Sequence, residues 1–80
     1  MTKRRITLFF PPELIKQPVI YKMAKECNVI PNIRRAKVTE SIGEVTLELE
    51  GSEADLERGI DYLKRAGVKV QPLEGDVVGS

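Results

Sequence analysis

The chain has 80 residues, of which 41% are hydrophobic and 31% are charged, and its formal net charge is +1. This length accommodates one domain with a thin core and excludes a large catalytic cleft. A net charge near zero provides no overall field that would attract nucleic acid or an acidic membrane. We therefore expect one domain over residues 1–80, with a folded core at about 4–74 and a tail at 75–80.

Several residue types on which catalysis and metal binding depend are scarce. The chain contains no histidine, which removes the usual general base and zinc ligand, and Cys27 is its only cysteine. No nucleophile–base pair can be assembled, so we expect a non-enzyme without metal or cofactor. The sequence also lacks a long apolar run and a signal-peptide pattern, which predicts a cytoplasmic protein that does not insert into a membrane.

Two elements are expected in the first third of the chain. Apolar and β-branched residues alternate over residues 5–10 and predict a strand, which the following prolines end. Apolar residues then recur at helical spacing and predict a helix over about residues 17–27, with Pro18 in its first turn. Cys27 falls on the apolar side of this helix and is expected to be buried. Asn28 stands where a left-handed helix cap is expected.

The second strand is expected over about residues 32–39. Pro31 has no N–H to donate, so this strand lies at a sheet edge or begins after the proline. Regular alternation would aim the Arg34 guanidinium at the core, and we expect a bulge or an exposed strand end to relieve that conflict. Residues 40–43 predict a hairpin turn, in which Gly43 is available for a positive φ.

The second half of the chain shows the clearest patterns. Glutamate or threonine alternates strictly with valine or leucine over residues 44–50, which predicts a strand with one buried face and one acidic face. Ser52, followed by Asp55 three residues later, predicts the start of a helix that ends at Gly67. Gly59 is expected to allow this helix to approach the sheet closely. A fourth strand is expected at residues 68–71.

This order of elements predicts a ferredoxin-like βαββαβ sandwich of the α+β class. Its four-stranded antiparallel sheet has the strand order 4-1-3-2, and two helices cover one face. The uncovered face then carries polar side chains together with Phe9, Ile33 and Arg35, which we consider candidates for a contact surface. Acidic side chains on the third strand would repel phosphate, so nucleic acid is not expected as a partner.

Four stretches of the chain resemble one known family. They are the Phe-Pro end of the first strand, Gln-Pro-Val-Ile-Tyr from residue 17, Asn-Val-Ile-Pro-Asn-Ile from residue 28, and Leu-Glu-Leu-Glu-Gly from residue 47. Together they resemble the NIL domain, whose namesake Asn-Ile-Leu signature stands here as Asn32-Ile33-Arg34. The resemblance covers about residues 4–74.

The resemblance implies two functions. NIL domains of methionine-import ABC transporter ATPases pair, bind methionine and inhibit uptake, and Asn32 matches the asparagine that helps to bind it. This chain would then be a homodimeric sensor of methionine or a related sulfur amino acid, with Asn32 as the polar anchor and Ile33 as an apolar wall. Other NIL domains stand alone or precede ferredoxin modules in proteins linked to homocysteine synthesis. The alternative is therefore a protein-interaction module that docks to a ferredoxin or another sulfur-metabolism protein and binds no small ligand.

Overall fold

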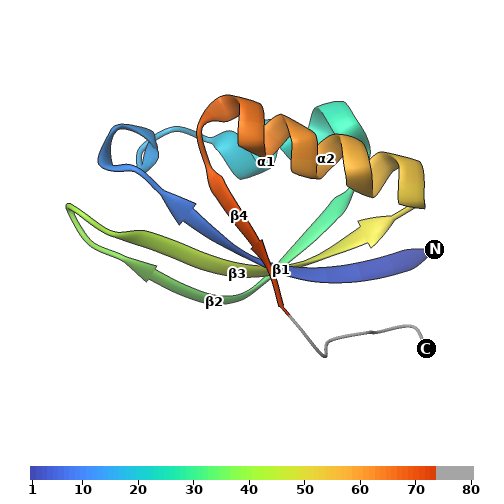
Figure 1. Ribbon diagram of the computed structural model, residues 1–80, viewed down its shortest axis with the longest axis horizontal. Helices are drawn as coiled ribbons and strands as arrows, with labels where there is room; N and C mark the ends of the chain where they lie inside the picture. Colours follow the sequence, from blue (N-terminus) through green and yellow to red (C-terminus); the bar gives the residue numbers. More distant parts are fainter. Residues whose placement is uncertain (74–80) are drawn as a thin grey trace.

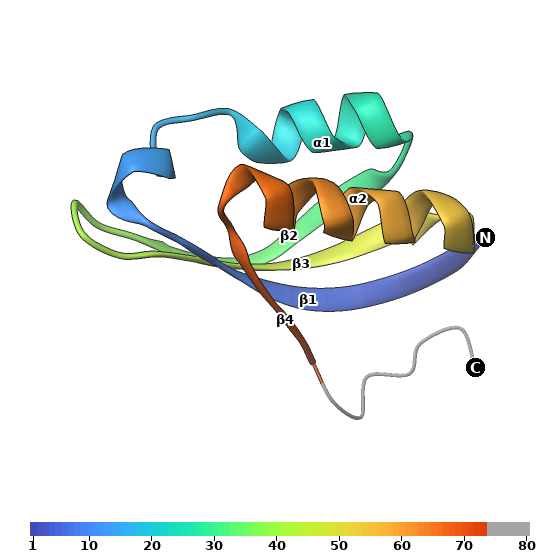
Figure 2. The same cartoon turned by 45° about the horizontal axis from the view of Figure 1, so that its top comes forward.

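A computed structural model describes residues 1–73 of the chain. Its elements are β1 (Thr2–Phe10), the 3-10 turn η1 (Pro12–Leu14), α1 (Val19–Cys27), β2 (Ile30–Val38), β3 (Gly43–Gly51), α2 (Glu53–Ala66) and β4 (Lys69–Pro72). The strands form one antiparallel sheet in the order β2-β3-β1-β4, and both helices lie on the same face of it (Figures 1 and 2). The predicted ferredoxin-like sandwich is confirmed. The predicted tail at 75–80 lies outside the described residues.

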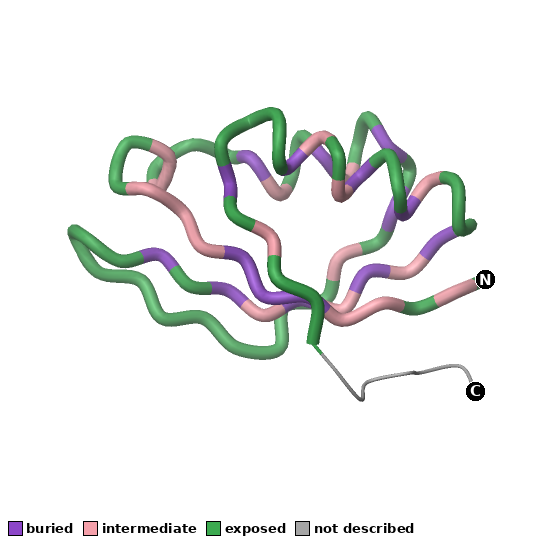
Figure 3. Tube along the Cα trace, viewed as in Figure 1, coloured by how far each residue is buried: buried purple, intermediate pink, exposed green. Residues whose placement is uncertain are grey.

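The core lies between the two helices and the two central strands. Strands β1 and β3 alternate as their sequences predict, so every second side chain faces the helices. The fully buried large side chains come from β1, β3 and both helices: Ile6, Leu8, Met23, Leu47, Leu49, Leu56 and Leu63. Edge strand β2 contributes none of them, and Figure 3 shows it exposed along almost its whole length. The helices therefore cover the centre of the sheet and leave β2 bare.

Both helices begin or end where local chemistry predicts. Ser52 accepts a hydrogen bond from the Asp55 N–H at 3.1 Å through its side-chain oxygen and so caps the start of α2. Asn28 ends α1 in the left-handed conformation, with φ 59° and ψ 46°, and Gly67 ends α2 with φ 104°. Helix α1 is shorter than expected, because Pro18 stands just before its first turn and not within it.

Two glycines have roles that differ from the predicted ones. Gly43 does not adopt a positive φ. A Cβ atom there would lie 3.0 Å from the Phe10 Cβ and 3.1 Å from the Ile15 Cγ1, so the position needs a small residue because the chain packs closely around it. Gly59 faces the Met23 side chain of α1, and a Cβ atom at this position would lie 3.1 Å from the Met23 sulfur. It therefore allows the two helices to approach each other, where we expected an approach to the sheet.

Strand β2 confirms the edge position that its proline predicts. It begins at Ile30, two residues before the predicted start, and so contains Pro31 within the strand. The missing N–H is tolerated because β2 has β3 on one side and no strand on the other within residues 1–73. A shift of register between Ile33 and Arg35 shows the expected bulge at Arg34.

Candidate functional site

The register of β2 against β3 places Asn32 and Ile33 on opposite faces of the sheet. Residues directly opposite each other in an antiparallel pair point to the same face. Asn32 lies opposite Glu48 and faces the open side, whereas Ile33 lies opposite the fully buried Leu47 and faces the helix side. The prediction that Ile33 lies on the uncovered face was wrong, because the bulge comes after Ile33 and reverses the alternation there. Within one chain, Ile33 does not form an apolar wall beside the Asn32 amide.

The open face around Asn32 is polar and carries both signs of charge. Glu48, opposite Asn32, accepts a hydrogen bond from Arg5 at 3.2 Å. Arg35 lies opposite Thr46, beyond the bulge, and returns to the same face as Asn32. Arg34 and Arg35 both line a shallow hollow on this face, so the bulge turns the Arg34 guanidinium away from the core. This surface could contact a ligand with both a carboxylate and an ammonium group.

The three predicted contact residues are not brought together on one surface. Phe9 lies opposite Glu44 on the open face, where it is partly buried, and it shares that face with Arg35. Ile33 is on the other face and is 56% exposed, because the helices do not extend over β2. Phe9 and Arg35 can therefore belong to one open-face surface, and Ile33 to a contact at the strand edge or on the helix side.

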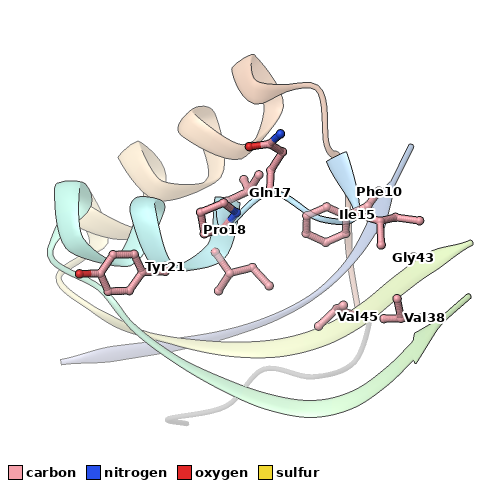
Figure 4. Close-up of a pocket in the computed structure, with 10 residues that line it drawn as sticks. Phe10, Ile15, Gln17, Pro18, Tyr21, Val38, Gly43 and Val45 are labelled. Atoms are coloured by element: carbon pink, nitrogen blue, oxygen red, sulfur yellow. The ribbon is translucent and has the colours of Figure 1, made fainter. Parts of the chain in front are cut away.

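An apolar pocket that the sequence analysis missed lies on the helix side. It has a volume of about 250 Å³ and opens between the start of α1, the end of β2 and the start of β3 (Figure 4). Its walls are apolar apart from Gln17 and the Tyr21 hydroxyl, and the lining residues are Phe10, Ile15, Gln17, Pro18, Val19, Ile20, Tyr21, Gly43, Val38 and Val45. Asn32 is not among them. The one signal in the sequence that could have indicated this pocket was Val38, an apolar residue at the end of a stretch rich in charged residues.

Cys27, Arg58 and Asp55 join the end of α1 to the start of α2. Burial raises the pKa of the Cys27 thiol, in spite of the opposing charge of Arg58. Arg58 also donates to the Cys27 carbonyl oxygen at 3.3 Å and to the Asp55 carboxylate, which links the start of α2 to the end of α1. Within these residues no three His, Cys, Asp or Glu side chains gather as metal ligands would, and no helix is long and apolar enough to cross a membrane.

Comparison with known proteins decides the family. The NIL domain model matches residues 4–72, almost the whole described chain. The chain belongs to the NIL domain family. A curated relative, the methionine import ATP-binding protein MetN 1 of Listeria innocua serovar 6a, is 26% identical over 77 residues. That match covers 91% of this NIL domain and 23% of the relative, so the chain spans about a quarter of the relative's length.

A solved structure shows the same fold. The crystal structure of the C-terminal domain of an ABC transporter ATP-binding protein from Enterococcus faecalis superposes on this NIL domain with a TM-score of 0.80. The two chains are 20% identical, and the match covers 94% of this chain and 88% of the other. The sandwich described above is therefore the fold of that C-terminal domain.

Proposed function

We propose that this NIL domain is a non-catalytic regulatory module that binds methionine or a related sulfur amino acid in the cytoplasm and acts as a homodimer. The observation that carries this proposal is the family match over residues 4–72, together with the similarity to a methionine import protein. The 80 residues contain no Gly-x-x-x-x-Gly-Lys-Ser/Thr stretch, which is the signature of a nucleotide-binding P-loop.

A calorimetric titration of the purified domain with methionine, homocysteine and cysteine tests the proposal. We expect saturable binding of at least one of them with a dissociation constant between micromolar and sub-millimolar, or about −4 to −8 kcal/mol. Glycine, which has the same charged ends and no side chain, is the matched control ligand. Light scattering on the same sample should give the mass of a dimer. Absence of heat with all three sulfur amino acids would contradict the ligand assignment.

The Asn32 anchor stays a prediction from the sequence. Its support in the structure is an exposed amide on a face that also presents Glu48 and Arg35. If Asn32 holds the ligand, Asn32→Ala should lower the affinity for methionine at least about tenfold, the loss of roughly one charge-assisted hydrogen bond. Gln71→Ala removes an exposed amide from the other edge strand and serves as the control. An unchanged affinity in Asn32→Ala would move the ligand elsewhere without removing it.

The homodimer is tested at the open face. Phe9 and Arg35 lie there among side chains of both charges, so two copies of this face can complement each other. Phe9→Glu should convert the dimer to a monomer in light scattering, because a carboxylate would then be buried in the contact. Lys64→Glu changes charge on the exposed surface of α2 and should leave the mass unchanged. A dimeric Phe9→Glu variant would exclude this face as the interface.

A second candidate function, docking to another protein, is favoured by the outer edge of β2. Within residues 1–73 this edge pairs with no strand, and it carries Arg34, Arg35 and Lys37, all exposed. Such an edge can accept an extended acidic segment of a ferredoxin or another sulfur-metabolism protein by strand addition. Ala36 and Val45 form a non-hydrogen-bonded pair, so the Ala36 N–H points to the outer edge, and capture of such a partner should be lost when Ala36→Pro removes it. Capture that survives both this change and Phe9→Glu would argue against docking.

A further inference from the structure

The bulge in β2 places two neighbouring arginines on one surface. In a regular strand, consecutive side chains point to opposite faces, so the sheet would separate Arg34 from Arg35. The register shift between Ile33 and Arg35 prevents this, and both of these bulge arginines line the hollow on the open face. Of the three strand pairs within residues 1–73, this is the one that contains such a shift. Bulges of this kind re-aim side chains and are frequent beside functional sites.

Two threonines line the same open-face hollow. Thr7 of β1 lies opposite Thr46 of β3, and their Oγ1 atoms are 3.2 Å apart. Only 7% of Thr7 is exposed, although it lies on the face that the helices do not cover. Because one of these hydroxyls donates to the other, one hydroxyl proton of the pair is left for another acceptor. The hollow therefore offers a hydroxyl donor beside its arginines.

The charges around the hollow leave the bulge arginines without a partner of opposite sign. Arg5 also lines the hollow, but its guanidinium donates to Glu48 at 3.2 Å. Glu44, the acidic residue of the lining, lies opposite Lys37. The ion pairs found among residues 1–73 include neither of the bulge arginines, and both are exposed. Three arginines and Lys37, set against the two glutamates, leave a local charge of +2.

A phosphate group matches this charge and these donors better than a carboxylate does. The phosphate of a monoester carries a charge of about −1.5 to −2 at neutral pH and has three strong acceptor oxygens. A carboxylate carries a single charge on two oxygens. Only the phosphate has enough acceptors for two guanidinium forks and a hydroxyl at once. The volume of the hollow, about 540 Å³, lies in the range of roughly 300–1,000 Å³ that is usual for small-molecule sites, so an organic group has room beside the phosphate.

We propose that the open-face hollow binds free phosphate or the phosphate group of a small molecule, through the bulge arginines and the Thr46 hydroxyl. The ligand is not a nucleic acid, because Glu44 and Glu48 would repel the flanking phosphates of a polymer. The inference goes beyond the proposed function and does not rest on it. Phe9, whose replacement tests the homodimer, is not among the lining residues, so different variants test the two proposals.

Calorimetry with simple probes tests the class of ligand. The probes are inorganic phosphate and ethyl phosphate, in a buffer with about 0.15 M chloride that screens weak attraction between exposed charges. We expect saturable binding with a dissociation constant of about 1 mM or below. Binding of both probes indicates a phosphorylated small molecule, and binding of inorganic phosphate alone indicates the free ion. Acetate should bind at least about tenfold more weakly than phosphate, since it neutralises one charge. Absence of saturable heat with both probes, or an equal affinity for acetate, would overturn the inference.

Arginine variants test the location. Arg34→Gln and Arg35→Gln should each lower the affinity for phosphate at least about tenfold, because each removes a charge-assisted hydrogen-bonding fork. Arg34→Lys keeps the charge and should still lower the affinity, by about threefold or more, because an ammonium group has no fork. Lys3→Gln is the matched control, since Lys3 is an exposed cation on the same face that does not line the hollow. Its affinity should stay within about twofold of the wild type. An equal loss in Lys3→Gln and Arg34→Gln would show general charge attraction and contradict a site.

Amide NMR spectra of the wild-type chain decide the location even if Arg34→Gln alters the bulge. Titration with phosphate should shift the amide signals of Thr7, Arg34, Arg35 and Thr46. The signal of Lys3, which is four residues or about 13 Å from Thr7 along β1, should stay unchanged. Shifts confined to the first turn of α1 or α2, where helices leave N–H groups without intrahelical acceptors, would place the anion there and refute the inference.

Discussion

Gly67, the residue that ends α2, offers a quantitative test of the fold. Its φ of 104° lies where side chains other than glycine are strained, and its N–H donates to the carbonyl oxygens of Leu63 and Lys64. In Gly67→Ala the positive φ costs about 1–2 kcal/mol. The added Cβ would also lie 3.2 Å from the Leu14 Cδ1, a side-chain tip that can move aside. Alanine restricts the unfolded chain, which returns about 0.4–1 kcal/mol.

The net expectation is that Gly67→Ala loses about 1 kcal/mol of unfolding free energy. For a domain of this size the melting temperature should then fall by about 4–8 °C. Urea unfolding followed by circular dichroism measures the first quantity, and a thermal scan measures the second. Gly67→Asn should lose less, because asparagine tolerates left-handed conformations better than alanine does.

Gly59→Ala is the matched control, because it makes the same chemical change inside the same helix. Alanine gains about 0.8–1 kcal/mol of helix propensity there. Part of this gain offsets the 3.1 Å approach of the new Cβ to the Met23 sulfur, which belongs to a flexible side chain. Its stability should therefore equal or exceed that of the wild type. The reasoning is refuted if Gly67→Ala is as stable as the wild type while Gly59→Ala is destabilised.

Three further expectations concern buried and charged groups. Hydrogen bonds from Arg58 and then from Ser52 lower the pKa of Asp55 below its ordinary 3.8. The stability that this carboxylate contributes at neutral pH should therefore be lost as the pH falls below that value. The Asp55→Asn variant should not show this loss of stability in an acid titration. Burial raises the pKa of Cys27 above 9.0, so the stability of the fold should decline as the pH rises above that value. A thiol reagent should modify Cys27 at least about tenfold faster in the chain unfolded by urea than in the folded chain. Leu47→Ala should cost about 2–5 kcal/mol in urea unfolding, since Leu47 of the central strand β3 is fully buried on the helix side of the sheet.

Local patterns in the sequence determined most of the fold. The strict alternation around Leu47 predicted β3, and Ser52 and Asn28 predicted helix ends that the structure confirms. Pro31 predicted the sheet edge, because a missing N–H excludes a central strand. These predictions succeed because each depends on neighbours within a few residues, where backbone hydrogen bonding and side-chain periodicity decide the conformation.

Only the tertiary structure decided which side chains share a surface. The conflict at Arg34 pointed to a bulge, but only the register shows that the bulge places Ile33 opposite Leu47, on the face away from Arg35. The neighbour of Gly59 proved to be Met23 of the other helix. The apolar pocket exists because α1 begins only at Val19 and does not extend over the end of β2. Its walls come from segments distant in the chain, so packing alone creates it.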